Sequence, residues 1–131
     1  MKKIITIIGA RPQFIKASVL SRLILNDNQL QEILIHTGQH YDENMSNIFF
    51  HEMEIPKPRY NLKIQSKFHG EMTGLMMSEI EKIVLNESPD CILVYGDTNS
   101  TLAGALVASK LKIKLAHVEA GLRSFNNNMP E

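Results

Sequence analysis

The sequence has one cysteine, no excess of charge of either sign and no long hydrophobic run. Cys91 has no second cysteine to pair with, which excludes an internal disulfide and favours a reducing compartment. Because 14 basic side chains balance 14 acidic ones, no broad field attracts nucleic acid or an anionic membrane, and any anion site must be local. The apolar run from Ile4 to Ile8 ends at Arg11 and Pro12, short of the roughly 7–15 apolar residues of a signal peptide. We expect a cytoplasmic protein that binds a small molecule, with no role for nucleic acid or membrane.

Several familiar motifs are also missing. The chain contains neither GxGxxG nor GxxxxGK[ST], which argues against a dinucleotide fingerprint and a P-loop. Its five histidines show no HExxH or other compact ligand spacing, so we expect no metal. No internal repeat, low-complexity stretch or linker is present. With 131 residues and 44% hydrophobic side chains, the chain can bury one core and is interpreted as a single domain or part of a larger protein.

The sequence does contain an alternation of strand-like and helical segments. Apolar runs of strand length occur at 3–8, 31–36, 91–95 and 113–118, with a weaker extended piece at 60–64. Because the segments between them have helical spacing, the connections must cross from strand to strand on both faces of a parallel sheet. The expected fold class is therefore α/β, a three-layer doubly wound parallel sheet of the Rossmann-like type, with strand order 3-2-1-4-5.

The helical segments predict where each helix begins and which face it buries. We expect helices from Pro12 to about Leu25, after Asp42, from about Gly70 to Leu85, and after Thr98. The buried stripe of the first should be Ile15, Val19, Leu20, Leu23 and Ile24, and that of the third Met72, Leu75, Met76, Ile80, Ile83 and Val84. The fourth is alanine-rich and should pack close to the sheet.

Glycines and polar residues follow the strands of this predicted sheet. The segments after strands one, two, four and five are Gly9-Ala10-Arg11, His36 to His40, Gly96-Asp97-Thr98 and His117 to Gly121. In a doubly wound sheet, ligands bind at the carboxyl ends of the strands where the strand order reverses, here between strands one and four. The convergence of Arg11, Asp97, His117 and Glu119 therefore predicts a ligand site at this edge.

The turn after the first strand favours an anion as ligand. Gly9 allows a tight turn, the helix start behind it offers N–H groups, and Arg11 and Lys16 add positive charge. The alternative is a routine strand-to-helix turn, which does not need both cations.

The turns after the last two strands suggest acid–base chemistry. Asp97 or Thr98 could simply cap the fourth helix. Strand periodicity, however, places His117 and Glu119 on one side of the fifth strand, next to a carboxylate from the fourth. Neighbouring carboxylates in a half-buried cleft bind protons more tightly, which suits a general acid or base near neutral pH. A structural hydrogen-bonded pair is the competing interpretation.

The segments GARPQFIK, GQHYD, YGDTNSTLAGALVA and HVEAGLRSFNNNMPE resemble the amino-terminal domain of the non-hydrolysing UDP-N-acetylglucosamine 2-epimerases. The resemblance spans nearly the whole chain, and GDT followed later by HVEAGLR is its most specific part. It implies the glycosyltransferase-B architecture, in which two Rossmann-like domains enclose the active site. Residues 1–131 would then be the amino-terminal domain, without the UDP-binding carboxy-terminal domain, and the full-length protein would be a homodimer.

The same resemblance implies the chemistry of an isomerase. These enzymes interconvert UDP-N-acetylglucosamine and UDP-N-acetylmannosamine by anti elimination of UDP, through 2-acetamidoglucal, and re-addition, with no cofactor or metal. By their motifs, Asp97, Glu119 and Glu131 match the family's catalytic carboxylates, whose separate roles stay open. Lys16 matches its active-site lysine, and Arg11 an arginine near the nucleotide sugar, with Gly9 and His117 also expected at the substrate. The 131-residue piece is expected to be inactive alone, because catalysis needs the closing cleft.

Departures from the family pattern leave alternatives open. Many members read GTRPE where this chain has GARPQ, and QHR where it has Gln39-His40-Tyr41. In the family this second segment lies near an activating UDP-N-acetylglucosamine, so Gln39 and His40 are a candidate effector site. The same segments also resemble the branch that acts on UDP-2,3-diacetamido-2,3-dideoxyglucuronate. Outside the family, the alternatives are a glycosyltransferase of the same architecture and a receiver-like or flavodoxin-like module, although a receiver would need acidic residues where this chain has Arg11.

Overall fold

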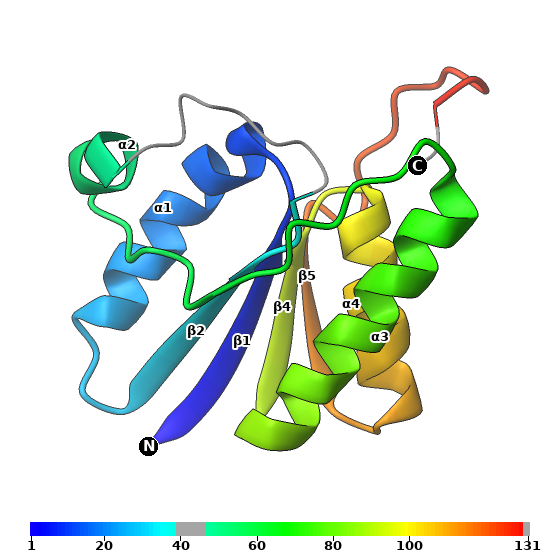
Figure 1. The fold of residues 1–131 in the computed structure, drawn as a ribbon. Helices are drawn as coiled ribbons and strands as arrows, with labels where there is room; N and C mark the ends of the chain where they lie inside the picture. The colour runs from blue at the N-terminus through cyan, green and yellow to red at the C-terminus, as the bar shows by residue number, and fades with distance from the viewer. Residues whose placement is uncertain (39–46, 130–131) are drawn as a thin grey trace.

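The computed structural model of the chain describes residues 1–38 and 47–129 and contains a parallel sheet with helices on both faces (Figure 1). The sheet has five strands in the order β3-β2-β1-β4-β5. Their bounds are Lys2–Ile8 for β1, Leu30–His36 for β2, Tyr60–Asn61 for β3, Cys91–Tyr95 for β4 and Lys114–Val118 for β5. Every pairing is parallel. The predicted fold class and strand order are confirmed; β3 is shorter than its predicted extended segment, and β5 begins one residue later than predicted.

The helices form the two outer layers of the fold. Their bounds are Arg11–Leu25 for α1, Asn47–Glu52 for α2, His69–Glu87 for α3 and Asn99–Lys110 for α4. Figure 1 shows α1 and α2 on one side of the sheet and α3 and α4 on the other. The sheet has a hydrophobic core on each face, and alternate side chains along a strand belong to different cores. Ile5 and Ile7 pack under α3 and α4, whereas Ile8 packs under α1. Within the described ranges, no helix is long and apolar enough to span a membrane.

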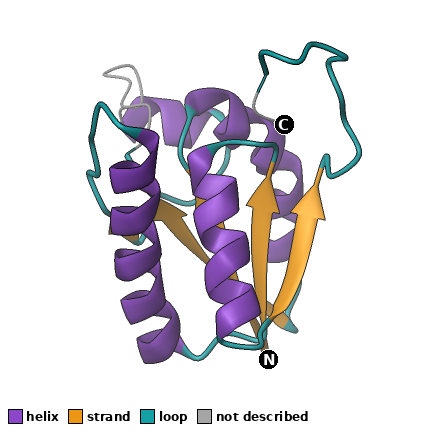
Figure 2. Cartoon of the chain, turned by 90° about the vertical axis from the view of Figure 1, so that its right-hand side faces the viewer, coloured by secondary structure: helices purple, strands orange, loops and turns teal. Residues whose placement is uncertain are grey.

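The strands all point toward one end of the molecule. Figure 2 shows the arrowheads directed to the end where the loop that leads to the C-terminus lies. This arrangement follows from parallel pairing, because each crossover helix must return the chain to the amino end of the next strand. The turns that follow the strands are therefore gathered at a single edge.

The buried face of α1 differs from the predicted one. Ile15, Val19 and Leu23 are 46%, 56% and 63% exposed. Of the predicted stripe, only Ile24 is buried, and Leu20 is partly buried against the core under α1. The prediction was wrong for the other residues because α1 carries two apolar stripes, and helical spacing alone does not say which one faces the sheet.

An aromatic contact selects the face of α1 that is buried. The Phe14 ring is fully buried and lies edge-on to His36 and Phe50, with ring centroids 5.1 and 5.4 Å apart. Edge-to-face contacts of this kind add to the free energy gained by burying the ring. The side chains buried on the same face of the helix are mostly small: Ala17, Ser18 and Ser21.

The third helix follows its prediction more closely. Four of its predicted core residues are buried: Met76, Ile80, Ile83 and Val84. Met72 packs partly buried against the same core, whereas Leu75 is 44% exposed and was wrongly assigned to it. Met76 is fully buried, where its flexible side chain can fill an irregular space in the core. The predicted cap Asp42 of the second helix lies outside the described residues.

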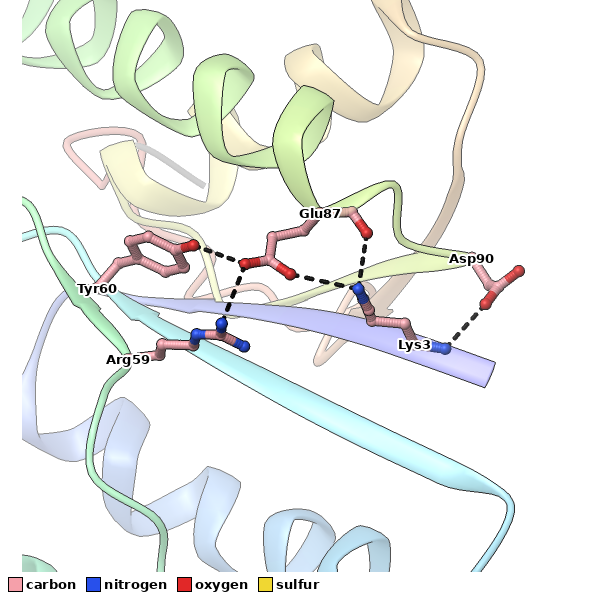
Figure 3. A network of polar contacts seen from close by, with 5 residues as sticks. All are labelled: Lys3, Arg59, Tyr60, Glu87 and Asp90. Atoms are coloured by element: carbon pink, nitrogen blue, oxygen red, sulfur yellow. Dashed lines mark hydrogen bonds and ion pairs between the residues drawn. The ribbon is translucent and has the colours of Figure 1, made fainter. Parts of the chain in front are cut away.

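A polar network fastens the carboxyl end of α3 to the sheet (Figure 3). The Glu87 carboxylate accepts hydrogen bonds from Tyr60 Oη at 2.6 Å and from Lys3 Nζ at 3.3 Å, and Arg59 lies 3.7 Å away. Lys3 Nζ also donates to the Glu87 backbone oxygen at 2.9 Å, and the Lys3 backbone N–H donates to Asp90 at 2.8 Å. The hydrogen bond from Tyr60, helped by the Lys3 and Arg59 charges, holds the pKa of Glu87 below its usual value despite burial.

Candidate functional site

The turns that follow β1, β2, β4 and β5 form one edge of the molecule, here called the rim. The rim comprises Gly9–Ala10, Thr37–Gly38, Gly96–Thr98 and Glu119–Gly121. Its parts are joined directly: Thr37 Oγ1 lies 2.8 Å from Ser100 Oγ at the start of α4, and the Gly96 N–H donates to the Val118 carbonyl at 3.0 Å. Segments far apart in the chain therefore meet where the sequence analysis expects a ligand.

Lys16 and Glu119 are in contact across the rim. Lys16 Nζ lies 2.9 Å from Glu119 Oε1 and 3.1 Å from Oε2, although the residues are 103 positions apart. The two side chains are 52% and 22% exposed, so they form an ion pair at the surface of the rim that a ligand can reach.

The backbone at Glu119 explains where its side chain points. The predicted strand ends at Val118, and Glu119 adopts φ of 69°, a left-handed conformation that is uncommon outside glycine. The expectation that strand periodicity places His117 and Glu119 on one side therefore does not apply. Instead, the turn itself directs Glu119 toward α1. Strained backbone of this kind clusters at functional sites.

His117 contacts the turn that carries Asp97. His117 Nε2 lies 2.6 Å from the Gly96 carbonyl oxygen, and since a carbonyl only accepts, this nitrogen carries the proton. Gly96 itself has φ of 69°, which a glycine adopts without strain. The imidazole thus holds the Gly96 peptide in place directly before Asp97, an exposed residue.

Thr98, and not Asp97, caps α4. The Thr98 side chain accepts from the Thr101 N–H, and the Thr101 side chain accepts in return from the Thr98 N–H. This reciprocal arrangement is a capping box, which satisfies the Thr98 and Thr101 amides. The helix-cap interpretation is therefore confirmed for Thr98 and wrong for Asp97, whose exposed carboxylate lies at the rim.

The amino end of α1 has the features expected of an anion site. No side chain caps it, and its first turn contains no acidic residue. The Gly9 N–H, however, donates to Gln13 Oε1 at 2.8 Å, so this amide already has a partner within the protein. Arg11 is the first residue of the helix, so its backbone lies at the rim.

Sequence analysis placed His36 at the predicted edge without assigning it a role, and the residue is buried at the carboxyl end of β2. His36 Nδ1 accepts the Gly38 N–H at 3.0 Å, and burial lowers the pKa of the imidazole, partly offset by a hydrogen bond with Ile8. Gly38 has φ of 87°, and a Cβ there would lie 2.8 Å from Lys63 Cα. In the sequence, the only indication was a histidine two residues before a glycine at the end of an apolar run. That pattern does not distinguish a structural role from a functional one.

Some predicted site residues cannot be placed at the rim. Gln39, His40 and Glu131 lie outside the described residues, and for Arg11 only the backbone position is described. In the parts of the chain that the structure describes, no three His, Cys, Asp or Glu side chains are grouped as metal ligands. The structure therefore brings together Gly9, Lys16, His117, Glu119 and the turn of Asp97.

Known proteins are similar to this chain in sequence as well as in fold. A family model described as UDP-N-acetylglucosamine 2-epimerase matches residues 22–131. The chain belongs to this epimerase family. Family membership decides against the receiver-like and flavodoxin-like alternatives.

Curated members of the epimerase family match almost the whole chain. The UDP-2,3-diacetamido-2,3-dideoxy-D-glucuronate 2-epimerase of Pseudomonas aeruginosa is 64% identical over 98% of this chain, which covers 36% of that protein. The UDP-N-acetylglucosamine 2-epimerase of Methanocaldococcus jannaschii is 58% identical over 98% of the chain, which covers 35% of that protein. The chain thus spans about a third of the length of these relatives.

Solved structures of epimerases have the same fold. That of the Methanocaldococcus jannaschii enzyme in complex with UDP-GlcNAc and UDP superposes with a TM-score of 0.89 at 58% identity, covering 100% of this chain and 36% of that one. The Neisseria meningitidis enzyme bound to UDP-GlcNAc gives a TM-score of 0.84 at 33% identity, covering 95% of this chain and 33% of that one.

Proposed function

We propose that residues 1–131 form the amino-terminal Rossmann-like domain of a two-domain UDP-sugar 2-epimerase of glycosyltransferase-B architecture. The observation that carries this proposal is the 64% and 58% identity to 2-epimerases over nearly the whole chain. A second, UDP-binding domain would close over the rim, and the isolated piece would be inactive because half of the cleft is missing. The full-length protein is proposed to be a cytoplasmic homodimer that requires no cofactor or metal.

The proposed reaction uses the carboxylates and cations of the rim. A carboxylate among Asp97, Glu119 and Glu131 removes the proton from C2 of the sugar while the C1–O bond breaks and UDP departs with the bonding electrons. UDP then adds back to the 2-acetamidoglucal intermediate, and C2 is protonated on the opposite face. Lys16 and Arg11 hold the diphosphate with the amino end of α1.

In this proposal, the Lys16–Glu119 ion pair is the state of the site before the substrate binds. Glu119 is paired with Lys16 at 2.9 Å, so before a ligand binds the carboxylate lies at the rim with this ammonium group as its partner. Arrival of a diphosphate offers Lys16 a doubly charged partner, so we propose that Lys16 moves to the phosphates and releases Glu119 toward the sugar. His117 supports the same step by fixing the turn that carries Asp97.

Substitution of the carboxylates tests the proposal. In the full-length protein, Asp97→Asn and Glu119→Gln should each reduce exchange of the C2 proton with deuterated solvent by about a hundredfold or more, the usual contribution of a general acid or base. Glu71→Gln, at an exposed position in α3, is the matched control and should exchange at the wild-type rate. Wild-type exchange in both rim variants would rule out their role.

The substrate is proposed to be UDP-N-acetylglucosamine, converted to UDP-N-acetylmannosamine. The alternative is UDP-2,3-diacetamido-2,3-dideoxyglucuronate, which is favoured by the 64% identity to an enzyme that bears that name. Comparing kcat/KM for the two UDP-sugars in the full-length protein decides between them. If addition of UDP-N-acetylglucosamine also activates the enzyme, Gln39→Ala and His40→Ala should remove that activation, as expected for the candidate effector site.

A further inference from the structure

A cavity of about 460 Å³ lies at the end of the molecule opposite to the rim. It is formed between the carboxyl half of α1 and the start of β2, at the end of the sheet where the N-terminus lies (Figure 1). Cavities of this size hold small organic ligands. None of the residues that line it belongs to the rim. Its wall includes Ser21, Ile24, Leu25, Leu30, Glu32 and Pro56.

Most of this wall is apolar, and part of it is exposed to solvent. Ile24 is buried, whereas Leu25 is 68% exposed. Met1, which also lines the cavity, is 83% exposed. A ligand with an apolar body would cover these side chains and remove their apolar surface from water, which favours binding.

Glu32 adds a carboxylate to the apolar wall. It lies two residues before Leu34, which packs under α1, so its side chain is on the same face of the sheet. Its Oε2 accepts a hydrogen bond from Thr6 Oγ1 at 2.6 Å. Its Oε1 is buried and has no hydrogen-bond partner among the described residues. Native structures leave few buried polar atoms unpaired, and a ligand or ion that binds there is one explanation for such an atom.

The cations close to Glu32 in the fold are paired with other carboxylates. Arg22 Nη1 lies 3.6 Å from Glu54, and Lys2 Nζ lies 3.9 Å from Asp90. Within the described ranges, Glu32 forms no ion pair. Burial, together with the Glu32 charge, raises the pKa of the Tyr95 hydroxyl, which shows that this charge acts on the interior. The described part of the protein therefore supplies no positive charge to the carboxylate.

We propose that this cavity binds a small organic cation, namely a primary amine with an apolar body. The ammonium group donates to the Glu32 carboxylate, and the apolar body lies against Leu25, Leu30 and Pro56. Because an ammonium group has three hydrogens to donate, it also reaches the Ser21 hydroxyl, which lines the cavity and is 1% exposed. This inference does not rest on the proposed function, since no residue of the rim takes part.

The Glu32 carboxylate can meet such a ligand without a change of fold. The terminal torsion of a glutamate side chain varies over a broad range, so the carboxylate turns toward the cavity when the amine binds. The Thr6 hydroxyl then keeps its hydrogen bond to either oxygen. Thr6 thus holds the carboxylate in place from the side of β1.

The chemistry of the cavity argues against other classes of ligand. An anion would be repelled by Glu32. A Ca²⁺ or Mg²⁺ ion requires six or more oxygen ligands, and no three His, Cys, Asp or Glu side chains are grouped as metal ligands in the described residues. A neutral ligand leaves the desolvated charge of Glu32 uncompensated. An amine should therefore bind more tightly than an alcohol of the same shape.

A saturation-transfer NMR titration of the full-length protein at neutral pH tests the proposal with phenethylamine as the probe. Its neutral and anionic analogues are 2-phenylethanol and 3-phenylpropanoate. Phenethylamine should bind saturably with a Kd of about 1 mM or below, as expected for a ligand of about nine non-hydrogen atoms. The alcohol should bind at least about tenfold more weakly, because it lacks the charge-assisted hydrogen bond. The anion should not bind.

Two variants locate the site. Glu32→Gln keeps an acceptor for Thr6 but removes the charge, and it should weaken phenethylamine binding about tenfold, to the level of the alcohol. Leu25→Trp, at an exposed position of the wall, places a larger side chain over the cavity and should weaken binding of the amine and the alcohol alike. Glu81→Gln removes the same charge from an exposed position of α3, on the other face of the sheet. This matched control should bind as the wild type does, and thermal melting shows that each variant is folded.

The outcomes either support the proposal or overturn it. Equal affinities for the amine and the alcohol overturn it, as do an unchanged affinity in Glu32→Gln and an absence of saturable binding. Saturating UDP-N-acetylglucosamine should leave the amine bound, because the rim lies at the other end of the strands. Displacement of the amine would place it at the rim and would also overturn the proposal. If the protein epimerises neither UDP-sugar, the proposed function fails, whereas the cavity is still judged by amine binding alone.

Discussion

Two polar atoms buried near α1 have no hydrogen-bond partner within the described part of the chain, Glu32 Oε1 and Tyr95 Oη. Tyr95 is 1% exposed and packs with Ile8, Phe14 and Leu93. Burial, together with the nearby Glu32 charge, raises the pKa of the Tyr95 hydroxyl. The ring therefore stabilises the core through its apolar surface, whereas its hydroxyl is desolvated without compensation.

Removing that hydroxyl should stabilise the protein. We expect Tyr95→Phe to raise the free energy of unfolding by about 1 kcal/mol, because the desolvation cost disappears and the packing remains. Urea denaturation at neutral pH measures the change. Tyr60→Phe is the matched control: its hydroxyl donates to Glu87 at 2.6 Å, so its loss should destabilise. A clear loss of stability in Tyr95→Phe would show that the hydroxyl has a partner in solution.

At the scale of the element, α4 packs against the sheet through small residues. Ala103 and Ala108 are fully buried, and Gly104 is buried between them. A Cβ on Gly104 would lie 2.8 Å from Ile7 Cδ1 and 2.9 Å from Val94 Cγ1. The predicted close approach of the alanine-rich helix is confirmed, and the distance is set by a glycine that sequence analysis did not single out.

A pair of glycine substitutions separates packing from helix propensity. Gly104→Ala should lower the free energy of unfolding by about 1–2 kcal/mol, because overpacking outweighs the gain in propensity. Gly74→Ala, in α3 with nothing within 4 Å of the added Cβ, should raise it by up to about 1 kcal/mol. Thermal or chemical denaturation of both variants gives the comparison. Equal effects of the two substitutions would mean that α4 shifts away from the sheet at little cost.

At the scale of the whole molecule, the contacts of the Glu87 network and those of the rim join different elements of the fold. Glu87 joins the end of α3 to β1 through Lys3 and to β3 through Tyr60. Its pKa is lowered from 4.5, chiefly by the Tyr60 hydrogen bond. The folded state therefore favours the ionised carboxylate, and the stability from this group is present above the unfolded pKa and lost as the pH falls through the folded one.

Lowering the pH should therefore reduce the free energy of unfolding of the wild-type protein more than that of a variant without the Glu87 carboxylate. We expect Glu87→Gln to unfold at lower urea concentration than wild type at about pH 7, with the difference shrinking at about pH 3 as Glu87 becomes protonated. Glu81→Gln, exposed on the same helix, should match wild type at both pH values. A difference for Glu87→Gln that persists unchanged in acid would mean that the carboxylate's charge does not contribute.

Much of the fold was predictable because the necessary information is local. Runs such as Ile4 to Ile8, and glycine or proline at the turns, define strands and connections, and right-handed parallel crossovers then leave few strand orders. The same reasoning located the rim, since parallel strands must all end at one edge. The motifs that contain Asp97 and His117 also indicate the family from the sequence alone.

The sequence by itself determined the class of the fold, the order of the strands and the edge where polar turns meet. Only the tertiary structure decided which stripe of α1 is buried, that Glu119 turns toward Lys16, and that Gln13 bridges two turns. Each of these depends on contacts between residues far apart in the chain, such as Gln13 and Tyr95, or on a backbone conformation like that of Glu119. Local periodicity cannot specify them, because several arrangements satisfy the same spacing and only the packed chain selects one.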